Sequence, residues 1–378
     1  MNIKLLNKIA ACGTDLFDKS KYNVAEEIDS PAAIMVRSAV MHDMAFDNSL
    51  LAIARAGAGV NNIPLERCAE EGIVVFNTPG ANANAVKELA IAALLLSCRK
   101  ITDAIDWAKN LSQDEDIAKA VEKGKGAFVG PELYGKTLAV IGLGAIGAMV
   151  ANAAISLGMK VIGYDPYLSV KSALMLNSET KVTADLSEAF SVADFITLHV
   201  PSTPSTKGMI NLDSIATMKD GVRIINLARA DLVDADSMKS ALDSDKVAKY
   251  VTDFPNNSLS AYKNVIAIPH LGASTPESED NCAVMAAKEL IDFLENGNIV
   301  NSVNYPNVSA PATQSNRITV AYKNKENAIS EITSVCSPIA IASGIRGDYG
   351  YAILDVTDTS FVDKLSALDF VIKARIVK

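Results

Sequence analysis

A glycine-rich turn is the first stretch whose residue types and spacing point to chemistry. The segment "VIGLGAIG" places Gly142, Gly144 and Gly147 in G-x-G-x-x-G register, between a strand-like run and a helical pattern. In this arrangement the first two glycines allow a tight turn and close approach to a pyrophosphate, and the third lets the helix pack on the strand. The next apolar run ends at Asp165, where a carboxylate binds ribose hydroxyls and disfavours a 2′-phosphate. The pattern therefore predicts an NAD site rather than an NADP site.

An arginine and a histidine follow two further apolar runs. Arg229 ends "VRIINLAR" and His270 ends "NVIAIPH". A guanidinium binds a carboxylate through two charged hydrogen bonds, and an imidazole donates and accepts protons near neutral pH. Each has an ordinary structural alternative, a helix-capping arginine or a loop-bonding histidine, but together at strand ends they favour acid–base chemistry on a keto acid. We expect His42 on the surface and His199 in the core or beside the cofactor.

Alternating strand and helix patterns must position these residues. Strand-like runs at 32–38, 50–57 and 72–80 precede an unbroken helical pattern from Asn84 to Lys109. Six further strand-like runs begin at residue 137 and predict a doubly wound parallel sheet, whose ligands gather at the strand C-termini. After a Pro/Ser/Asn-rich linker, the last 62 residues read βαββαβ, which is typical of a ferredoxin-like domain.

Length and composition exclude several classes of protein. At about 100 to 200 residues per domain, a chain of 378 residues predicts two or three domains. Its formal net charge of -9 works against binding to nucleic acid. Five scattered cysteines, without CxxC or Cys/His clusters, predict a reduced protein with no structural metal. The longest apolar run is about half of the roughly 20 residues that a membrane span needs, so we expect a cytoplasmic protein and no membrane partner.

Seven motifs together resemble the D-isomer-specific 2-hydroxyacid dehydrogenases, and within them the D-3-phosphoglycerate dehydrogenase branch. In order they are "VRS" (36–38), "RAGAGVNNI" (55–63), "NTPGANANAV" (77–86), "GLGAIG" (142–147), "HVPSTPSTKGMI" (199–210), "NLARADLVD" (226–234) and "PHLGASTPES" (269–278). The resemblance implies an α/β fold in which a doubly wound Rossmann domain is inserted in a flavodoxin-like substrate domain, with a small ACT-like domain at the end. The implied bounds are 1–84 and 272–308 for the substrate domain, 85–271 for the NAD-binding domain and 317–378 for the ACT-like domain.

The resemblance also implies roles for individual residues. His270 would be the acid/base, and Arg229 would bind the carboxylate and keto oxygen of the substrate. Besides the three glycines, Asp165 and His270, the cofactor would meet Ala145, Ile146, Val200, Pro201, Leu227, Asp253, Gly272 and Ala273. The substrate-domain loops would supply Arg37, Ser38, Arg55, Gly57, Ala58, Gly59 and Asn82. For each of the two arginines in these loops, a solvated or ion-paired side chain is the ordinary alternative.

The activity implied by the resemblance is NAD-dependent oxidation of 3-phospho-D-glycerate to 3-phosphohydroxypyruvate, the first step of serine biosynthesis. The hydride would pass to NAD and the proton to His270. Another D-2-hydroxyacid dehydrogenase, such as a glyoxylate or hydroxypyruvate reductase, is one alternative. A catalytically weak NAD-binding interaction protein is a second. In each case we expect a homodimer or homotetramer.

Two stretches depart from the pattern of the resembled enzymes. Those enzymes usually pair the active-site histidine with a Glu in "DVFxxEP", whereas "DFPNNS" places Asn257 or Ser258 there. Without that carboxylate we expect a lower pH optimum for keto-acid reduction, unless another acid or a neutral Asn257 orients the ring. In the tail, Tyr322 and Glu326 replace the His and Pro of an HxNxPG effector loop, while Asn324 is kept. An amino-acid effector such as serine and a purely assembling role therefore both remain open.

Overall fold

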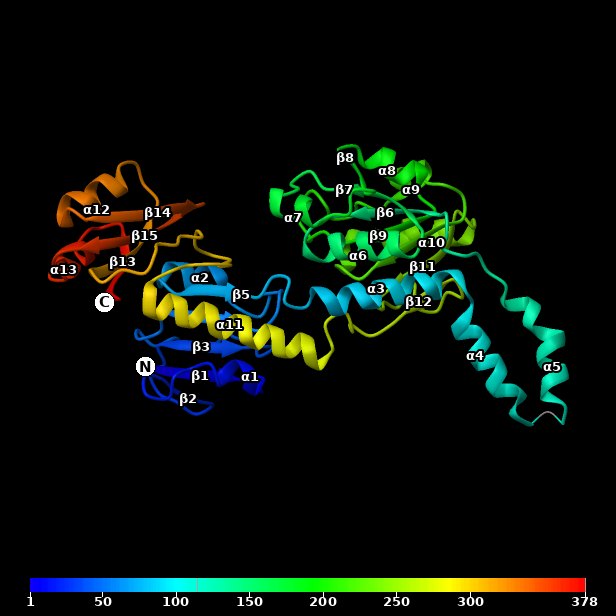
Figure 1. Cartoon of the computed structure of the whole chain (residues 1–378), viewed down its shortest axis with the longest axis horizontal. Coiled ribbons are helices and arrows are strands. Elements are labelled where there is room, and N and C mark those ends of the chain that lie inside the picture. Colours follow the sequence, from blue (N-terminus) through cyan, green and yellow to red (C-terminus); the bar gives the residue numbers. More distant parts are fainter. Residues whose placement is uncertain (114, 378) are drawn as a thin grey trace. The chain divides into compact units, whose positions relative to one another are not determined.

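The computed structural model describes residues 1–113 and 115–377, which fold into two compact units. Unit 1 comprises Met1–Asn82 and Thr275–Lys378, and unit 2 comprises Ala83–Ser274. In Figure 1 the two segments of unit 1 are blue and yellow to red, and unit 2 runs from cyan through green.

A seven-stranded parallel sheet forms the centre of unit 2, with strand order β12-β11-β10-β9-β6-β7-β8. The strands are β6 (Thr137–Ile141), β7 (Lys160–Tyr164), β8 (Lys181–Thr183), β9 (Phe195–Leu198), β10 (Val222–Asn226), β11 (Val247–Thr252) and β12 (Val265–Ala267). The central strand β9 is buried along its whole length because helices cover both faces of the sheet, which explains its continuous apolar sequence. The strand order reverses between β6 and β9, and ligands of doubly wound sheets bind at such a point.

Helices form a layer on each face of this sheet. α3 (Ala83–Cys98) and α6 (Ala145–Ser156) share one core with the sheet. The opposite core contains side chains of α8 (Leu186–Val192), α9 (Leu212–Thr217) and α10 (Ala235–Asp243). The remaining helical segments are α4 (Ile101–Asn110), η1 (Leu111–Gln113), α5 (Ile117–Gly124), η2 (Lys125–Phe128), α7 (Val170–Met175) and η3 (Ala230–Leu232). The predicted doubly wound Rossmann domain is confirmed.

The predicted unbroken helix from Asn84 to Lys109 is wrong. α3 ends at Cys98, and α4 begins at Ile101. Gly130 approaches the end of α3 so closely that a Cβ atom there would lie 1.9 Å from the Cys98 carbonyl oxygen. A segment about thirty residues away thus occupies the space beside the helix end. Strand β8 is a second difference, since its three residues at the sheet edge carry no long apolar run.

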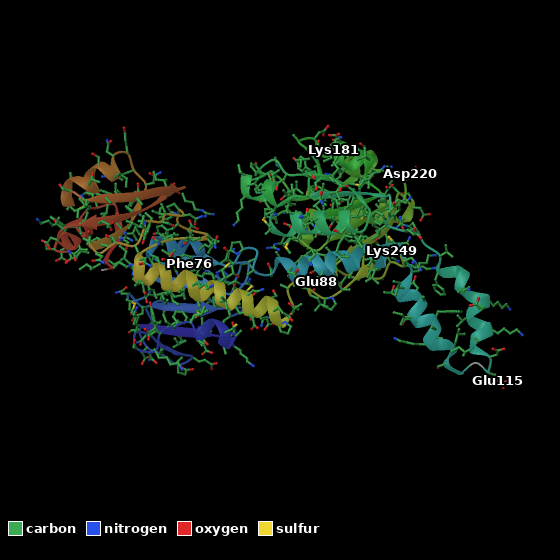
Figure 2. All side chains as sticks on the ribbon, in the orientation of Figure 1. Phe76, Glu88, Glu115, Lys181, Asp220 and Lys249 are labelled. Atoms are coloured by element: carbon green, nitrogen blue, oxygen red, sulfur yellow. The ribbon has the colours of Figure 1, made fainter. Side chains whose placement is uncertain are left out.

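Unit 1 contains a five-stranded parallel sheet of order β2-β1-β3-β4-β5, which is the order of the flavodoxin-like fold that the resemblance implies. The strands are β1 (Asn2–Leu6), β2 (Asn23–Ala25), β3 (Ala33–Val36), β4 (Ala52–Arg55) and β5 (Val74–Asn77), with helices α1 (Ala11–Thr14), α2 (Leu65–Glu70) and α11 (Pro276–Asn296). β1 and β2 are absent from the predicted strands. Phe76 of β5 packs edge-to-face on Phe293 of α11, with ring centroids 5.6 Å apart. Phe76 is labelled in Figure 2.

The tail adds a four-stranded antiparallel sheet of order β14-β15-β13-β16 to unit 1. Its elements are β13 (Asn316–Lys323), α12 (Ala328–Cys336), β14 (Ala340–Arg346), β15 (Tyr349–Val356), α13 (Phe361–Ser366) and β16 (Val371–Ile376), the predicted ferredoxin-like sequence. One face of the sheet packs against α12 and α13 (Figure 1). From the other face, Ala321, Tyr351 and Ile353 enter the same core as Ile3 and Phe293. The tail and the five-stranded sheet therefore share one core.

Candidate functional site

The carboxyl ends of six strands form one row across the sheet of unit 2. Their paired last residues are Tyr164, Ile141, Leu198, Asn226, Thr252 and Ala267, from β7 to β12. The residues that follow five of these positions are Asp165, Gly142, His199, Leu227 and Asp253. Parallel pairing thus brings these five residues to one edge, although Gly142 and Asp253 are 111 residues apart in sequence.

The glycine loop at this edge has no room for side chains at two positions. Gly142 adopts φ +93°, and a Cβ atom there would lie 2.6 Å from the carbonyl oxygen of His199 and 2.9 Å from Val200. A Cβ atom on Gly147 would lie 1.8 Å from the carbonyl oxygen of Gly142. A Cβ atom on Gly144, by contrast, would meet nothing within 4 Å. The loop therefore needs glycine for its own fold at two positions, and leaves open space at the third.

Helix α6 begins directly after this loop, with Gly144 as its N-cap residue. No side chain in the described part of the chain caps the helix, so the N–H groups of its first turn remain available. Gly144 and Ala145 are exposed, and Ile146 is half-buried. A helix start with free N–H groups binds phosphate oxygens well.

Asp165 lies against the same loop. One of its carboxylate oxygens accepts a hydrogen bond from the Leu143 N–H at 2.9 Å, and the other accepts one from the Tyr167 N–H at 2.9 Å. These bonds fix the carboxylate beside the glycine turn, and each oxygen keeps lone pairs for a further donor such as a ribose hydroxyl.

Arg229 lies in a turn that a buried asparagine holds. The side-chain oxygen of Asn226 accepts from the Ala228 N–H at 3.1 Å, and its amide nitrogen donates to the Arg229 carbonyl at 2.8 Å. The Arg229 side chain is exposed, and its guanidinium donates to the Ala228 carbonyl at 2.7 Å. Since that bond uses one N–H group, several donors remain for an anionic ligand.

Asp253 and His270 follow the neighbouring strands β11 and β12. Asp253 is 1% exposed, and neither carboxylate oxygen has a hydrogen-bond partner among the described residues. Burial raises the pKa of Asp253, while the nearby His270 and Arg229 act in the opposite direction. His270 is exposed, and its ring packs on Phe254 with centroids 5.0 Å apart.

His199 has a different environment from His270. Its Nε2 lies 3.0 Å from the Thr197 hydroxyl, and burial lowers the pKa of His199 to about 4. The imidazole is therefore neutral at pH 7, which fits a residue that lines the site better than one that exchanges protons. His42 is exposed, with its Nε2 2.9 Å from the Asn61 carbonyl oxygen.

The predicted substrate residues other than Arg229 gather at the carboxyl edge of the other sheet, in unit 1. Val36, Arg55 and Asn77 are paired across β3, β4 and β5, so the loops after these strands are neighbours. Arg55 Nε donates to the Arg37 carbonyl at 3.0 Å. A Cβ atom on Gly57 would lie 1.9 Å from Arg55 Nη1, so only glycine leaves room for this arginine.

The remaining residues of this second group lie on the same three loops. Ser38 follows β3, Ala58 and Gly59 follow β4, and Asn82 ends the loop after β5. Asn77 donates to the Ala58 carbonyl at 2.6 Å and so ties two of the loops together. Arg37 forms an ion pair with Glu279 of α11, at 2.6 Å. The ion-paired alternative therefore describes Arg37 in this structure.

Two asparagines that position these loops are missing from the predicted site. Asn226 holds the turn of Arg229, and Asn7 accepts from the backbone N–H groups of Ser38 and Ala39 at 2.9 and 2.7 Å. Asn226 is fully buried at the end of a strand whose other residues are mostly apolar. A lone amide in such a run is a usable signal, because a buried amide requires partners. Asn7 adopts φ 74°, which nothing in the sequence indicates.

Three further findings concern metal ions, membrane spans and cysteines. Within residues 1–113 and 115–377, no group of three or more His, Cys, Asp or Glu side chains could hold a metal ion. None of the helices in that same part of the chain is long and apolar enough to cross a membrane. All five cysteines are free, and only Cys12 is exposed.

Comparisons with known proteins agree with this arrangement. Residues 91–272 match the family "D-isomer specific 2-hydroxyacid dehydrogenase, NAD binding domain". The D-3-phosphoglycerate dehydrogenase of Methanocaldococcus jannaschii is 37% identical over 298 residues, which are 76% of this chain and 55% of the relative. That of Synechocystis sp. is 35% identical over 320 residues, 82% of this chain and 55% of the relative. The chain thus spans about half the length of the curated relatives it matches.

Solved structures of similar fold extend the comparison. The NAD+-bound 3-phosphoglycerate dehydrogenase of Entamoeba histolytica has a TM-score of 0.62 and 26% identity, covering 80% of this chain and 98% of the other. The apo D-mandelate dehydrogenase of Rhodotorula graminis has a TM-score of 0.68 and 23% identity, covering 82% and 99%. The second similarity concerns the fold alone.

Proposed function

Because this chain belongs to the D-isomer specific 2-hydroxyacid dehydrogenase family, we propose that it is an NAD-dependent dehydrogenase of 3-phospho-D-glycerate. The reaction would produce 3-phosphohydroxypyruvate. The observation that carries the proposal is the row of strand ends in unit 2, since it gathers a glycine loop, a ribose-binding carboxylate, an arginine and a histidine. The curated relatives named above support this choice of substrate.

The residues at this edge fit NAD. The tight glycine turn and the free N–H groups of α6 suit a pyrophosphate, and Asp165 suits the ribose hydroxyls. The two oxygens of Asp253, which have no partner among the described residues, suit the N–H donors of a carboxamide, because buried acceptors without partners are unfavourable. When bound, NAD would accept the hydride from C2 of the substrate. Val200, Pro201, Leu227, Gly272 and Ala273 would contact the cofactor from the neighbouring loops.

Arg229 would bind the negatively charged end of the substrate, and His270 would exchange the hydroxyl proton. The guanidinium of Arg229 would bind the substrate carboxylate and the oxygen on C2 with charged hydrogen bonds. His270 would take the hydroxyl proton as the C2–H bond breaks, and return it in the reverse reaction. Since burial keeps His199 neutral, His270 is the better candidate for this exchange.

The loops at the carboxyl edge of the sheet in unit 1 would bind a phosphate group. Arg55 would supply positive charge for the phosphate, and Asn82 would supply an amide. Arg37, Ser38, Gly57, Ala58 and Gly59 would complete the loops at that edge. Arg37 pairs with Glu279 through one guanidinium nitrogen, so its other N–H groups would remain for this role.

The protein would act as a cytoplasmic homodimer or homotetramer. The surface of α4 and α5 supports an assembly, since it exposes Ile105 and Ile117, and the described part of these helices buries no side chain. An amino-acid effector at the ferredoxin-like tail is a further proposal. Asn324 there donates to the Gly347 carbonyl, and the Tyr322 hydroxyl is buried without a partner among the described residues.

Turnover assays test the activity directly. We expect NADH production with 3-phospho-D-glycerate, and NADH consumption with 3-phosphohydroxypyruvate above the rates with glyoxylate and hydroxypyruvate. Arg229→Lys keeps the charge but loses bidentate binding, so it should lower kcat/KM by at least about tenfold. Lys207→Arg is the matched control, because Lys207 is an exposed residue of the loop after β9 and is not among the proposed site residues, and it should be neutral. If the chain binds NADH but reduces no 2-keto acid, the proposed activity is wrong and an interaction protein becomes the better interpretation.

A further inference from the structure

Unit 1 contains a pocket of about 400 Å³, and none of the residues that line it is among those predicted to bind cofactor or substrate. The loop after β5, helix α11 and the segment that follows α11 form its walls. The lining residues are Gly80, Ala81, Asn281, Val284, Met285, Lys288, Glu289 and Asn301. Pockets that bind small molecules have volumes of about 300 to 1,000 Å³, so this one has room for a small ligand.

One face of α11 forms most of the wall. Four of the lining residues follow the three- and four-residue spacing that places side chains on the same side of a helix. They are Asn281, Val284, Met285 and Lys288. Val284 and Met285 are half-buried, whereas Asn281 and Lys288 are exposed. The wall therefore has an apolar middle between two polar side chains.

Glu289 supplies a buried carboxyl group to the same pocket. The residue is 8% exposed, and one of its oxygens accepts from the Asn301 amide at 2.7 Å. Asn301 is itself held by β5, because its carbonyl oxygen accepts the Asn77 N–H at 3.3 Å. The second Glu289 oxygen has no hydrogen-bond partner among the described residues. A buried carboxyl group with an unused oxygen favours a ligand that brings a donor, and most of all a cation.

We propose that this pocket binds a small zwitterion with an apolar body, such as a free amino acid with an aliphatic side chain. The ammonium group would take the place of the Glu289 proton, and the aliphatic part would contact Val284 and Met285. The carboxylate would pair with Lys288, which forms no ion pair within residues 1–113 and 115–377. A carboxylate ligand alone would leave Glu289 without a donor, and an amine alone would face the charge of Lys288. The site is separate from the tail and does not depend on the proposed activity.

Titration of the full chain with L-valine, followed by nuclear magnetic resonance of the methionine methyl groups, tests the site without any turnover. The chain has 11 methionines, and the signal of Met285 is assigned with Met285→Leu. We expect L-valine to shift this signal. L-valinamide lacks the carboxylate and 3-methylbutanoate lacks the ammonium group, so each should bind at least about tenfold more weakly than L-valine.

Two variants test the charged ends of the pocket separately. Glu289→Gln keeps an acceptor for Asn301 but cannot ionise, so it should bind L-valine at least about tenfold more weakly in a folded chain. Lys288→Gln changes an exposed residue and should weaken binding similarly. Glu277→Gln, an exposed acid of the same helix, is the matched control and should bind like wild type. An unmoved Met285 signal, or equal binding by wild type and both pocket variants, would overturn the proposal, because L-valine would then bind nowhere or at another place such as the tail.

Discussion

Glu289 offers a sharp test of how burial sets stability in unit 1. It lies on α11 with 8% of its surface exposed. One carboxyl oxygen accepts from the Asn301 amide at 2.7 Å, and the other is buried without a partner among the described residues. Burial raises the pKa of Glu289 to about 8 from an ordinary 4.5, and the Asn301 bond only partly opposes this. The folded chain therefore keeps a proton at neutral pH that the unfolded chain releases.

The sign and size of the effect follow from proton linkage. Between the two pKa values the folded state binds more protons than the unfolded state, so stability falls as pH rises. At about 1.4 kcal/mol per pH unit, the free energy of unfolding should fall by about 3 kcal/mol between pH 5 and pH 8 through this residue alone. Glu289→Gln keeps an acceptor for Asn301 and removes the titration. The variant should match wild type near pH 5 and exceed it by about 3 kcal/mol at pH 8.

Buried cysteines provide a readout for each unit. Cys68 and Cys282 are buried in unit 1, and Cys98 is buried in unit 2. Their labelling by an aromatic disulfide reagent, measured against urea concentration at both pH values, reports the unfolding of each unit. The substitution should shift the midpoints of Cys68 and Cys282 at pH 8 and leave Cys98 unchanged.

Glu277→Gln is the matched control, because Glu277 is an exposed residue of the same helix. It should leave the pH dependence of all three midpoints unchanged. If Glu289→Gln gives equal changes at pH 5 and pH 8, Glu289 does not titrate between these values, and the argument from burial fails. A loss of stability at both values would instead show that the variant disturbs packing.

Two further predictions concern glycine and a buried ion pair. Gly142→Ala should lower the melting temperature of unit 2 because its Cβ would meet the His199 carbonyl, whereas Gly144→Ala should melt like wild type but bind NAD at least about tenfold more weakly. Calorimetry and titration with NAD check both, and equal stability of the two variants would contradict the first. Arg317→Met should destabilise unit 1 by about 3 kcal/mol, since Arg317 is fully buried and pairs with Asp355 at 2.7 Å. The double variant, Arg317→Met together with Asp355→Leu, should recover most of the lost free energy of unfolding, measured in urea. If it recovers none, an unpaired buried charge is not the cause of the loss.

The sequence predicts those parts of the fold that depend on local pattern. β6 and the glycine loop follow from a buried apolar run and a fixed spacing, and the parallel sheet of unit 2 follows from the alternation of strands and helices. The end of α3 does not follow from local pattern, because Gly130, which lies beside it, belongs to a distant segment. β8 carries only three residues, and its pattern is too short to recognise.

The candidate site likewise has some features that the sequence predicts and others that it does not. Parallel strand ends make it predictable that Arg229, Asp253 and His270 share an edge. The ion pair of Arg37 with Glu279 is not predictable, since the two residues are 242 positions apart and meet only after folding. Among the described residues, Asp253 has no side-chain hydrogen bond, and this is also not predictable, because it depends on where the folded loops place their donors.

The shared core couples the stability of the tail to that of the rest of unit 1. Tyr351 donates to the Gly297 carbonyl at 2.8 Å, and Arg317 donates to the Asn296 carbonyl at 3.0 Å, so β13 and β15 hold the end of α11. The same helix contributes Glu279 to the Arg37 pair at its other end. A molecule that stiffens the tail would therefore raise the unfolding temperature of the whole unit. Deleting the tail would also remove part of the core on which β3, β4, β5 and the loops after them rest.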